Sequence, residues 1–171
     1  WALDGGGALM NQGIHGIDFV QWIMGDVESV FAKAGTLTRN IDVEDTAVAI
    51  LNFRSGAYGV IIGATSVYPS APFRVNFHGE LGTITIQEET ITKWEVIGED
   101  PKDVRVVEET NAPKAIAAKG HLYHVLDLMA AVREDREPFI NGEEARKAVE
   151  IILAIYESSR CGKEIRIKDL R

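Results

Sequence analysis

Residues 45–67 read DTAVAILNFRSGAYGVIIGATSV, and their pattern predicts a β-hairpin. Two sets of residues alternate over 45–53, with Thr46, Val48, Ile50 and Asn52 in one set and Ala47, Ala49, Leu51 and Phe53 in the other. This period of two is typical of a strand, because successive side chains point to opposite faces of a sheet. Arg54-Ser55-Gly56 is a turn signal, and a second β-type run covers 57–67. We therefore expect two adjacent antiparallel strands.

Further β-type runs flank this hairpin. They cover 27–38, 73–78, 83–87 and 90–97, with shorter runs at 104–108 and 165–167. Most of the connections are too short for a crossover helix, so the sheet is expected to be mainly antiparallel. Both alternating sets of the hairpin are rich in apolar or small residues, which is typical of a sheet covered on both faces. A sister subunit or another domain is therefore expected on the face that the helices leave open.

Helical patterns lie at the two ends of the chain. The first covers residues 8–24, with an apolar stripe of Leu9, Ile14, Ile17 and Trp22, and Gly25 ends it. The second covers 115–133 and the third covers 141–160. The order of helix, strands and two helices predicts an α+β fold, with a mainly antiparallel open β-sheet and helices packed on one face.

Composition narrows the function classes. The 171 residues are 46% hydrophobic and 26% charged, as in a globular domain. The net charge of −8 argues against nonspecific binding to nucleic acid or to an anionic membrane surface. Cys161 is the single cysteine, which excludes an internal disulfide and a multi-cysteine zinc site. With no apolar run long enough for a membrane span and no signal peptide at Trp1, a cytoplasmic location is expected.

Residues 5–18, GGGALMNQGIHGID, hold the candidate catalytic groups. Asn11 and His15 are four residues apart and share a helix face, and Asp18 is placed to hold the His15 imidazole by a hydrogen bond. Histidine suits proton transfer near neutral pH. The glycines at 5–7 would leave the first helix amides open to an anionic or polar group. The alternative is that this histidine is structural, and the glycines do not form the G-x-G-x-x-G fingerprint of dinucleotide-binding proteins.

A second group of polar residues opens the helix expected at 115–133. His121 and His124 flank Tyr123, and Asp127 follows His124 by three residues. Imidazole and carboxylate groups on one helix face can bind a metal ion. The alternative is that they are ordinary polar residues near a helix start.

The stretch at 5–18, followed by Trp22 and Gly25, resembles the start of the C-terminal domain of the Gfo/Idh/MocA oxidoreductases. The order of later motifs agrees with this resemblance, which covers nearly the whole chain. These motifs are Glu44-Asp45-Thr46, the run HGELGT at 78–83, Pro138, Asn141-Gly142 and the run AIYES at 154–158.

The resemblance implies a two-domain enzyme. An N-terminal Rossmann domain would bind NAD or NADP and carry a catalytic lysine, and that domain is absent from this sequence. Residues 1–171 would then be the substrate-binding and oligomerisation C-terminal domain, a fragment of a longer chain. It would contain no cofactor-binding residues of its own and would be inactive in isolation. Its sheet would pair subunits into a homodimer or homotetramer.

The resemblance also assigns roles to four residues. His15 matches the family histidine that accepts the proton of the hydroxyl whose carbon loses hydride. Asn11 stands where an aspartate is common, so it would orient substrate by hydrogen bonds without acting as a base. Asp18 would orient His15, and His121 would lie near the rim of the substrate cleft. No metal is implied.

The expected function is therefore part of an NAD(P)-dependent dehydrogenase that acts on a sugar, nucleotide sugar or polyol. Two alternatives stay open. One is a non-enzymatic sugar-binding or dimerisation module of the same fold, and the other is a metal-dependent enzyme that uses His15, His121 or His124.

Overall fold

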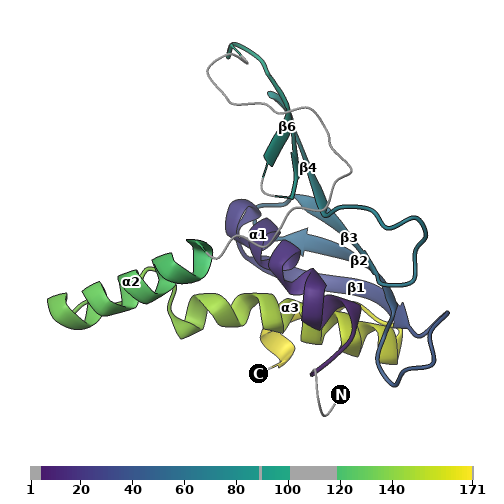
Figure 1. Ribbon diagram of the computed structural model, residues 1–171. Coiled ribbons are helices and arrows are strands. Elements are labelled where there is room, and N and C mark those ends of the chain that lie inside the picture. The colour runs from purple at the N-terminus through teal and green to yellow at the C-terminus, as the bar shows by residue number, and fades with distance from the viewer. Residues whose placement is uncertain (1–4, 89, 101–118, 171) are drawn as a thin grey trace. The chain divides into compact units, whose positions relative to one another are not determined.

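The computed structural model describes residues 5–88, 90–100 and 119–170 (Figure 1). Its elements are η1 (Leu9–Gly13), α1 (Ile14–Met24), β1 (Val27–Gly35), β2 (Thr46–Phe53), β3 (Tyr58–Ala64), β4 (Arg74–Gly79), β5 (Gly82–Gln87), β6 (Thr90–Val96), α2 (Lys119–Glu134), α3 (Gly142–Cys161), β7 (Ile165–Arg166) and η3 (Ile167–Leu170). Strands β4 to β6 form one compact unit, and the other elements form a second unit. The strand expected at 104–108 and the helix start expected at 115–118 lie outside the described residues.

The predicted hairpin is confirmed. Strands β2 and β3 pair antiparallel, and they belong to a four-stranded sheet in the order β3-β2-β1-β7. Along β2 the burial alternates as the period of two requires. The buried set is Ala47, Ala49, Leu51 and Phe53. One face of this sheet therefore lies in the core.

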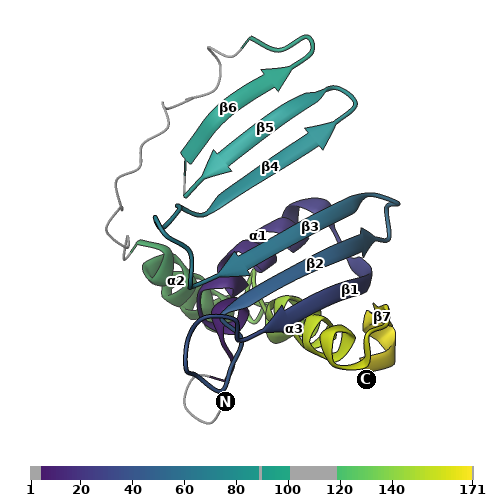
Figure 2. The same ribbon diagram turned by 90° about the vertical axis from the view of Figure 1, so that its right-hand side faces the viewer.

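Helices α1 and α3 cover that buried face, and both lie on the same side of strands β1 to β3 (Figure 2). The shared core contains Leu9, Ile17, Val30, Leu51, Ile151, Ile152 and Ile155. Helix α3 starts at Asn141, whose side chain accepts a hydrogen bond from the amide of Glu144 at 3.0 Å. It ends at Gly162, which has the left-handed φ of 70° that glycine adopts without steric cost. The expectation of helices on one face is confirmed.

Two serines of α3 protect the edge of β1 beyond its short pairing with β7. The Ser158 hydroxyl accepts a hydrogen bond from the amide of Ala32 at 2.9 Å. The Ser159 hydroxyl accepts from the amide of Ala34 at 2.8 Å and donates to its carbonyl at 3.0 Å. These bonds satisfy backbone groups that a bare edge strand would expose, so α3 closes this edge as well as the face.

The unit that contains β4 to β6 is a three-stranded antiparallel sheet in the order β4-β5-β6. Its buried residues are polar: Thr85 donates to the Asn76 amide oxygen at 2.9 Å, and Gln87 accepts from Arg74 at 3.0 Å. We expected one sheet, but the described strands form two. Residues 67–72, with two prolines that cannot donate to a ladder, separate the last strand of one sheet from the first strand of the other.

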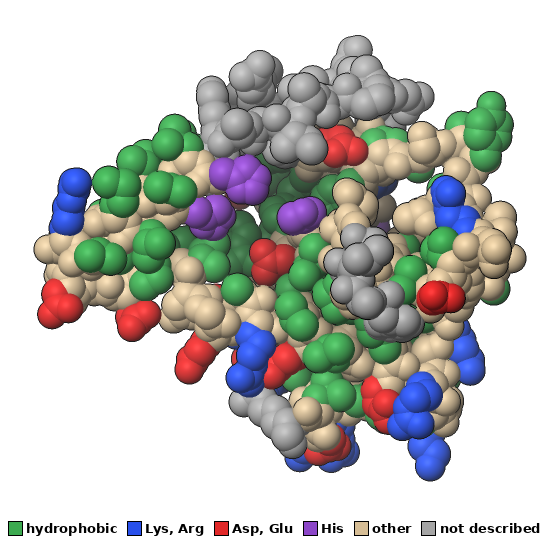
Figure 3. All heavy atoms as spheres, turned by 60° about the horizontal axis from the view of Figure 1, so that its bottom comes forward, with side chains coloured by type: hydrophobic (Ala, Val, Ile, Leu, Met, Phe, Trp, Pro, Cys, Tyr) green, Lys and Arg blue, Asp and Glu red, His purple; other side chains and the backbone are tan. Residues whose placement is uncertain are grey.

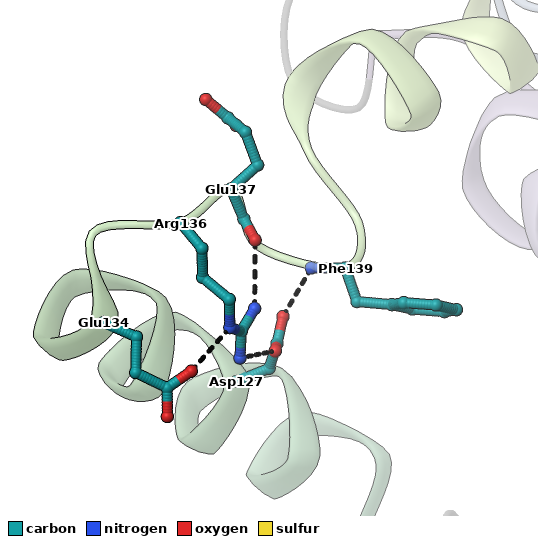
Figure 4. Close-up of polar contacts among 5 residues, drawn as sticks. All are labelled: Asp127, Glu134, Arg136, Glu137 and Phe139. Atoms are coloured by element: carbon teal, nitrogen blue, oxygen red, sulfur yellow. Dashed lines mark hydrogen bonds and ion pairs between the residues drawn. The ribbon is translucent and has the colours of Figure 1, made fainter.

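Helix α2 exposes the stripe that its sequence predicts for a core. Exposed hydrophobic side chains are Leu122, Tyr123, Val125, Leu126, Leu128, Met129 and Val132, while Ala131 is buried. The turn into α3 is fixed by Asp127, which accepts hydrogen bonds from the Phe139 amide at 2.7 Å and from Arg136 at 2.8 Å (Figure 4). These two interactions lower the pKa of the Asp127 carboxyl. Because its hydrophobic residues are exposed, the apolar stripe of α2 is not part of the core formed by α1, α3 and the sheet.

The α+β fold class is confirmed, with two corrections in the first helix. Its first turn, η1, is π-helical, and regular α-helix begins only at Ile14. Trp22, expected in the apolar stripe, is 66% exposed, and Gln21 is buried in its place. Gln21 follows Ile17 by four residues and shares its buried face, whereas Trp22 follows Ile17 by five residues and is turned away from that face. None of the described helices is long and apolar enough to cross a bilayer.

Candidate functional site

The candidate catalytic residues lie on η1 and α1. Leu9 and Ile17 face the core, while Asn11, His15 and Asp18 are exposed on the other side of the same helix. The expectation that Asn11 and His15 share an accessible helix surface agrees with this placement. The side chain of Gln12 donates to the Asn11 carbonyl oxygen at 3.1 Å, which leaves the Asn11 amide nitrogen free to meet a ligand.

The structure shows no hydrogen bond between Asp18 and His15, both of which lie in the described part of the chain. The role of Asp18 as an orienter of the imidazole therefore stays a prediction. The His15 ring is instead placed by the backbone of the helix that carries it. The contacts that hold the backbone of this helix therefore determine where Asn11 and His15 lie.

The start of this helix is held by Glu44, which is buried just before β2. Its Oε2 accepts from the amide of Gly7 at 3.0 Å, and its Oε1 accepts from the amide of Leu9 at 2.9 Å. Its backbone carbonyl accepts from the amide of Ala8 at 3.0 Å. Three consecutive amides therefore donate to one residue. The expectation that these amides are open to an external anion is wrong for Gly7 and Leu9, because the protein supplies the anionic group itself.

The glycines at 6 and 7 are explained by this contact. A Cβ on Gly7 would lie 1.9 Å from the Glu44 carbonyl oxygen, and a Cβ on Gly6 would lie 2.7 Å from the Tyr156 hydroxyl. No side chain fits at either position without moving the neighbouring groups. The glycine run thus serves a close approach within the fold.

Tyr156 of α3 completes the contact. Its hydroxyl donates to Glu44 Oε1 at 3.0 Å. Burial, and then the hydrogen bond to Glu44, raise the pKa of the Tyr156 phenol above its ordinary value. The phenol therefore remains a protonated donor across the physiological pH range. Sequence reasoning noted Glu44 and Tyr156 only as parts of motifs; a buried acid facing a glycine run is visible only once the chain is folded.

Asp45, the next residue, holds a different segment. Its carboxylate accepts from the amides of Leu37, Thr38 and Arg39 at 2.8–2.9 Å. The hydrogen bonds from Leu37 and Arg39 are the largest causes that hold the pKa of this buried carboxyl well below its ordinary value. Glu44 and Asp45, which lie directly before β2, therefore hold two different segments, residues 7–9 and residues 37–39.

Histidine side chains gather on one face of the molecule, beside hydrophobic side chains (Figure 3). His121 and His124 lie on α2 and are exposed, in the same unit as His15, whereas His78 is on β4. Within residues 5–88, 90–100 and 119–170, no three His, Cys, Asp or Glu side chains form a group that could hold a metal ion. Asp127, considered as a ligand with His124, is bonded to Arg136 and Phe139 (Figure 4).

The open face of the four-stranded sheet is a second candidate site. It exposes six large hydrophobic side chains: Phe31, Val48, Ile50, Tyr58, Val60 and Ile62. The strand register places Phe31, Ile50 and Val60 in one row and Val48 beside Ile62 in the next. We call these six residues the outer face. Contiguous exposed apolar residues of this kind are typical of an interaction surface.

Comparison with known proteins places these features in a family. Residues 2–167 match the family model described as "Oxidoreductase family, C-terminal alpha/beta domain". The myo-inositol 2-dehydrogenase of Thermotoga maritima is 35% identical over 97 residues, which is 50% of this chain and 28% of that protein. The D-apiose dehydrogenase of Rhizobium rhizogenes is 24% identical over 168 residues, which is 91% of this chain and 47% of that protein.

A solved structure is also similar to this chain. The WlbA dehydrogenase from Bordetella pertussis, in complex with NADH and UDP-GlcNAcA, matches with a TM-score of 0.79 and 33% identity, over 94% of this chain and 46% of that chain. The chain thus spans at most about half the length of these relatives.

Proposed function

Since the chain belongs to the Gfo/Idh/MocA oxidoreductase family and forms its C-terminal α/β domain, we propose that it is the substrate-binding and oligomerisation domain of an NAD(P)-dependent dehydrogenase. The substrate class is a sugar, nucleotide sugar or polyol. The observation that carries this proposal is the similarity to the NADH and UDP-GlcNAcA complex of the WlbA dehydrogenase, at 33% identity over 94% of the chain. The relatives that act on myo-inositol and D-apiose support the same class.

His15 is proposed as the acid–base residue. In the oxidation, the hydroxyl proton of a secondary alcohol passes to the imidazole as the carbon–oxygen bond becomes a carbonyl. A bound nicotinamide cofactor supplies the acceptor for the hydride that leaves the same carbon. The imidazole is exposed on α1, so a substrate hydroxyl can reach it. Asn11, also exposed, is proposed to orient the substrate, since its amide can both donate and accept.

Asp18 and His121 are proposed to support binding at the edges of this site. Both are exposed, one on α1 and one at the start of α2. Each can hydrogen-bond to a hydroxyl-rich ligand.

The described residues do not offer a cradle for the cofactor pyrophosphate at this helix. The amides that such a group would use are bonded to Glu44, as the distances above show. We propose that cofactor binding belongs to the N-terminal domain that the family resemblance implies. No residue described here is proposed as a cofactor ligand.

The outer face is proposed as the surface that pairs subunits. Its six residues are apolar and span three strands, and Lys33 pairs with Val48 in the strand register beside them. Buried apolar surface is the main driving force of stable association between subunits. A homodimer or homotetramer is the proposed assembly.

The test of the catalytic proposal uses His15→Ala in the complete enzyme. We expect kcat to fall by about 10²- to 10⁴-fold, the usual contribution of general acid–base catalysis, with the KM for the cofactor unchanged. His78→Ala is the matched control, because it removes an exposed histidine from the other unit. A wild-type kcat in both variants would reject His15 as the acid–base residue. A complete protein without dehydrogenase activity would favour the non-enzymatic alternative.

A further inference from the structure

The contact between Glu44 and the start of the first helix has a functional consequence. We propose that Glu44 is the positioning residue of the catalytic helix: it sets the place and rotation of η1 and α1, and through them the directions of Asn11 and His15. This inference rests on the proposed role of His15. Glu44 itself is buried and touches no substrate.

Glu44 accepts three hydrogen bonds from the start of the helix. Both carboxylate oxygens and the backbone carbonyl of Glu44 accept hydrogen bonds from the amides of residues 7, 8 and 9. Three consecutive donors hold a backbone segment in place at three acceptor atoms of one residue, and hydrogen bonds depend on direction as well as distance. The next turn carries Asn11, and one further turn carries His15.

Glu44 is itself immobilised from the sheet side. Its neighbour Asp45 donates its amide to Gly35 at 3.2 Å and accepts at its carbonyl from Thr65 at 2.9 Å. Strand β2 begins at the following residue, Thr46. The carboxylate is thus tied to the ends of β1 and β3, so the sheet is the fixed frame and the helix is what it positions.

Core packing alone does not fix the helix in the same way. Leu9 is fully buried, and a Cβ on Gly63 would lie 2.6 Å from Leu9 Cδ2, so one side chain anchors the first turn to β3. Ile17 is also buried, and Met10, Ile14, Val20 and Met24 pack against the same core, so apolar contacts hold the helix on the sheet, but dispersion contacts are not directional. The hydrogen bonds to Glu44 are directional and oppose rotation of the helix about its axis.

Tyr156 links this frame to α3. Its hydroxyl donates to the same Oε1 that accepts from Leu9. The carboxylate therefore receives three hydrogen bonds. A glutamine cannot replace it, because one of its two terminal atoms is an NH₂ donor that would meet the Gly7 or Leu9 amide.

The first measurement is amide hydrogen exchange by NMR on the 171-residue chain, which needs no activity. In Glu44→Gln we expect the amides of Gly7 to Leu9 to exchange at least about tenfold faster, and the signals of Asn11 and His15 to shift. The matched control is Asp45→Asn, which removes the neighbouring buried carboxylate. It should accelerate exchange at Leu37 to Arg39 and leave residues 7–15 unchanged.

Tyr156→Phe is the milder variant, in case Glu44→Gln does not fold. It removes one of the three donors to the carboxylate, so we expect the same signals to move in the same direction by a smaller amount. Unchanged exchange at residues 7–9 and unchanged Asn11 and His15 signals, in whichever variant folds, would overturn the proposal.

The second measurement is kinetic and uses the complete enzyme. Glu44→Gln is expected to lower kcat by about 10- to 100-fold, the scale on which a misplaced catalytic group slows a reaction, without changing the KM for the cofactor. Asp45→Asn should lower thermal stability without that fall in kcat, which separates positioning from general destabilisation. A normal kcat in Glu44→Gln beside a low kcat in His15→Ala would overturn the positioning role. A normal kcat in both, with altered exchange at residues 7–9, would leave the positioning of the helix supported and reject the proposed acid–base role.

Discussion

The two faces of the four-stranded sheet are both apolar, yet they differ in the size of their side chains. On the covered face of β3, Gly59 and Gly63 leave no room for a Cβ, because Phe53 and Leu9 lie against them. On the covered face of β2, two of the four positions are Ala47 and Ala49. The outer face instead carries valine, isoleucine, phenylalanine and tyrosine.

This difference has a packing reason. Helices α1 and α3 of the same chain approach the covered face closely, and close-packed interiors accept only the volume that fits. The outer face has no such partner within the unit, and its larger side chains offer more apolar area per residue to a separate surface. The covered face thus combines small residues with the large Leu51 and Phe53, whereas the outer face, which we assign to another subunit, consists of large apolar residues.

The largest expected effect tests the covered face. Ile152→Ala removes a fully buried side chain of α3 and should lower the free energy of unfolding by about 2–5 kcal/mol. Ile62→Ala makes the same chemical change at a position that is 76% exposed, and should cost about 0.5 kcal/mol or less in the monomer. Urea denaturation at low protein concentration measures both. Equal losses would show that the two faces are equally covered within one chain.

The next effect tests the outer face. Val60→Asp places a charge at a residue that is 67% exposed in one subunit and would be desolvated in an assembly. Sedimentation velocity should show at least tenfold weaker association, because a buried unpaired charge opposes it, with a normal circular dichroism spectrum. Lys163→Ala is the control, because it changes the net charge by the same amount at an exposed residue that is not part of the outer face. An unchanged association state in Val60→Asp, or a wild-type monomer at high concentration, would remove the outer face as the interface.

The smallest expected effect appears only at acidic pH and concerns Asp45, which lies directly before β2. The folded pKa of Asp45 lies below its ordinary value of 3.8, so its contribution to stability is fully present above about pH 4 and is lost as the pH falls further. The thermal midpoint of the wild type should therefore fall steeply below pH 4. Asp45→Asn should be less stable at pH 7 but show a shallower fall in acid. Parallel curves for the two proteins would mean that other carboxyl groups control acid unfolding.

Much of the fold could be predicted from local patterns. The period of two over 45–53 predicted the two alternating sets of β2, and Arg54-Ser55-Gly56 marked the turn of the hairpin. Asn141 and Gly162 marked the two ends of α3. These predictions succeed because alternation, turn chemistry and capping act over a few residues.

Predictions that depend on partners distant in the sequence were less successful. Trp22 was expected in the core and is exposed, and the strands form two sheets instead of one. The glycines at 5–7 were interpreted as an opening for a ligand, whereas the amides of Gly7, Ala8 and Leu9 donate to Glu44, which lies 37 residues away from Gly7. Local pattern cannot show which distant group fills a space.

The sequence by itself determined the α+β class, the hairpin, the exposed pair Asn11 and His15, and the resemblance to the oxidoreductase family, because these follow from short-range periodicity and from motifs. Only the tertiary structure decided that Glu44 binds the start of the first helix and that, among the described residues, helices α1 and α3 cover one apolar face of the sheet. Those features depend on which side chains meet after the chain has folded. Residues far apart in the sequence compete for the same space and the same hydrogen bonds, and that competition is resolved only in three dimensions.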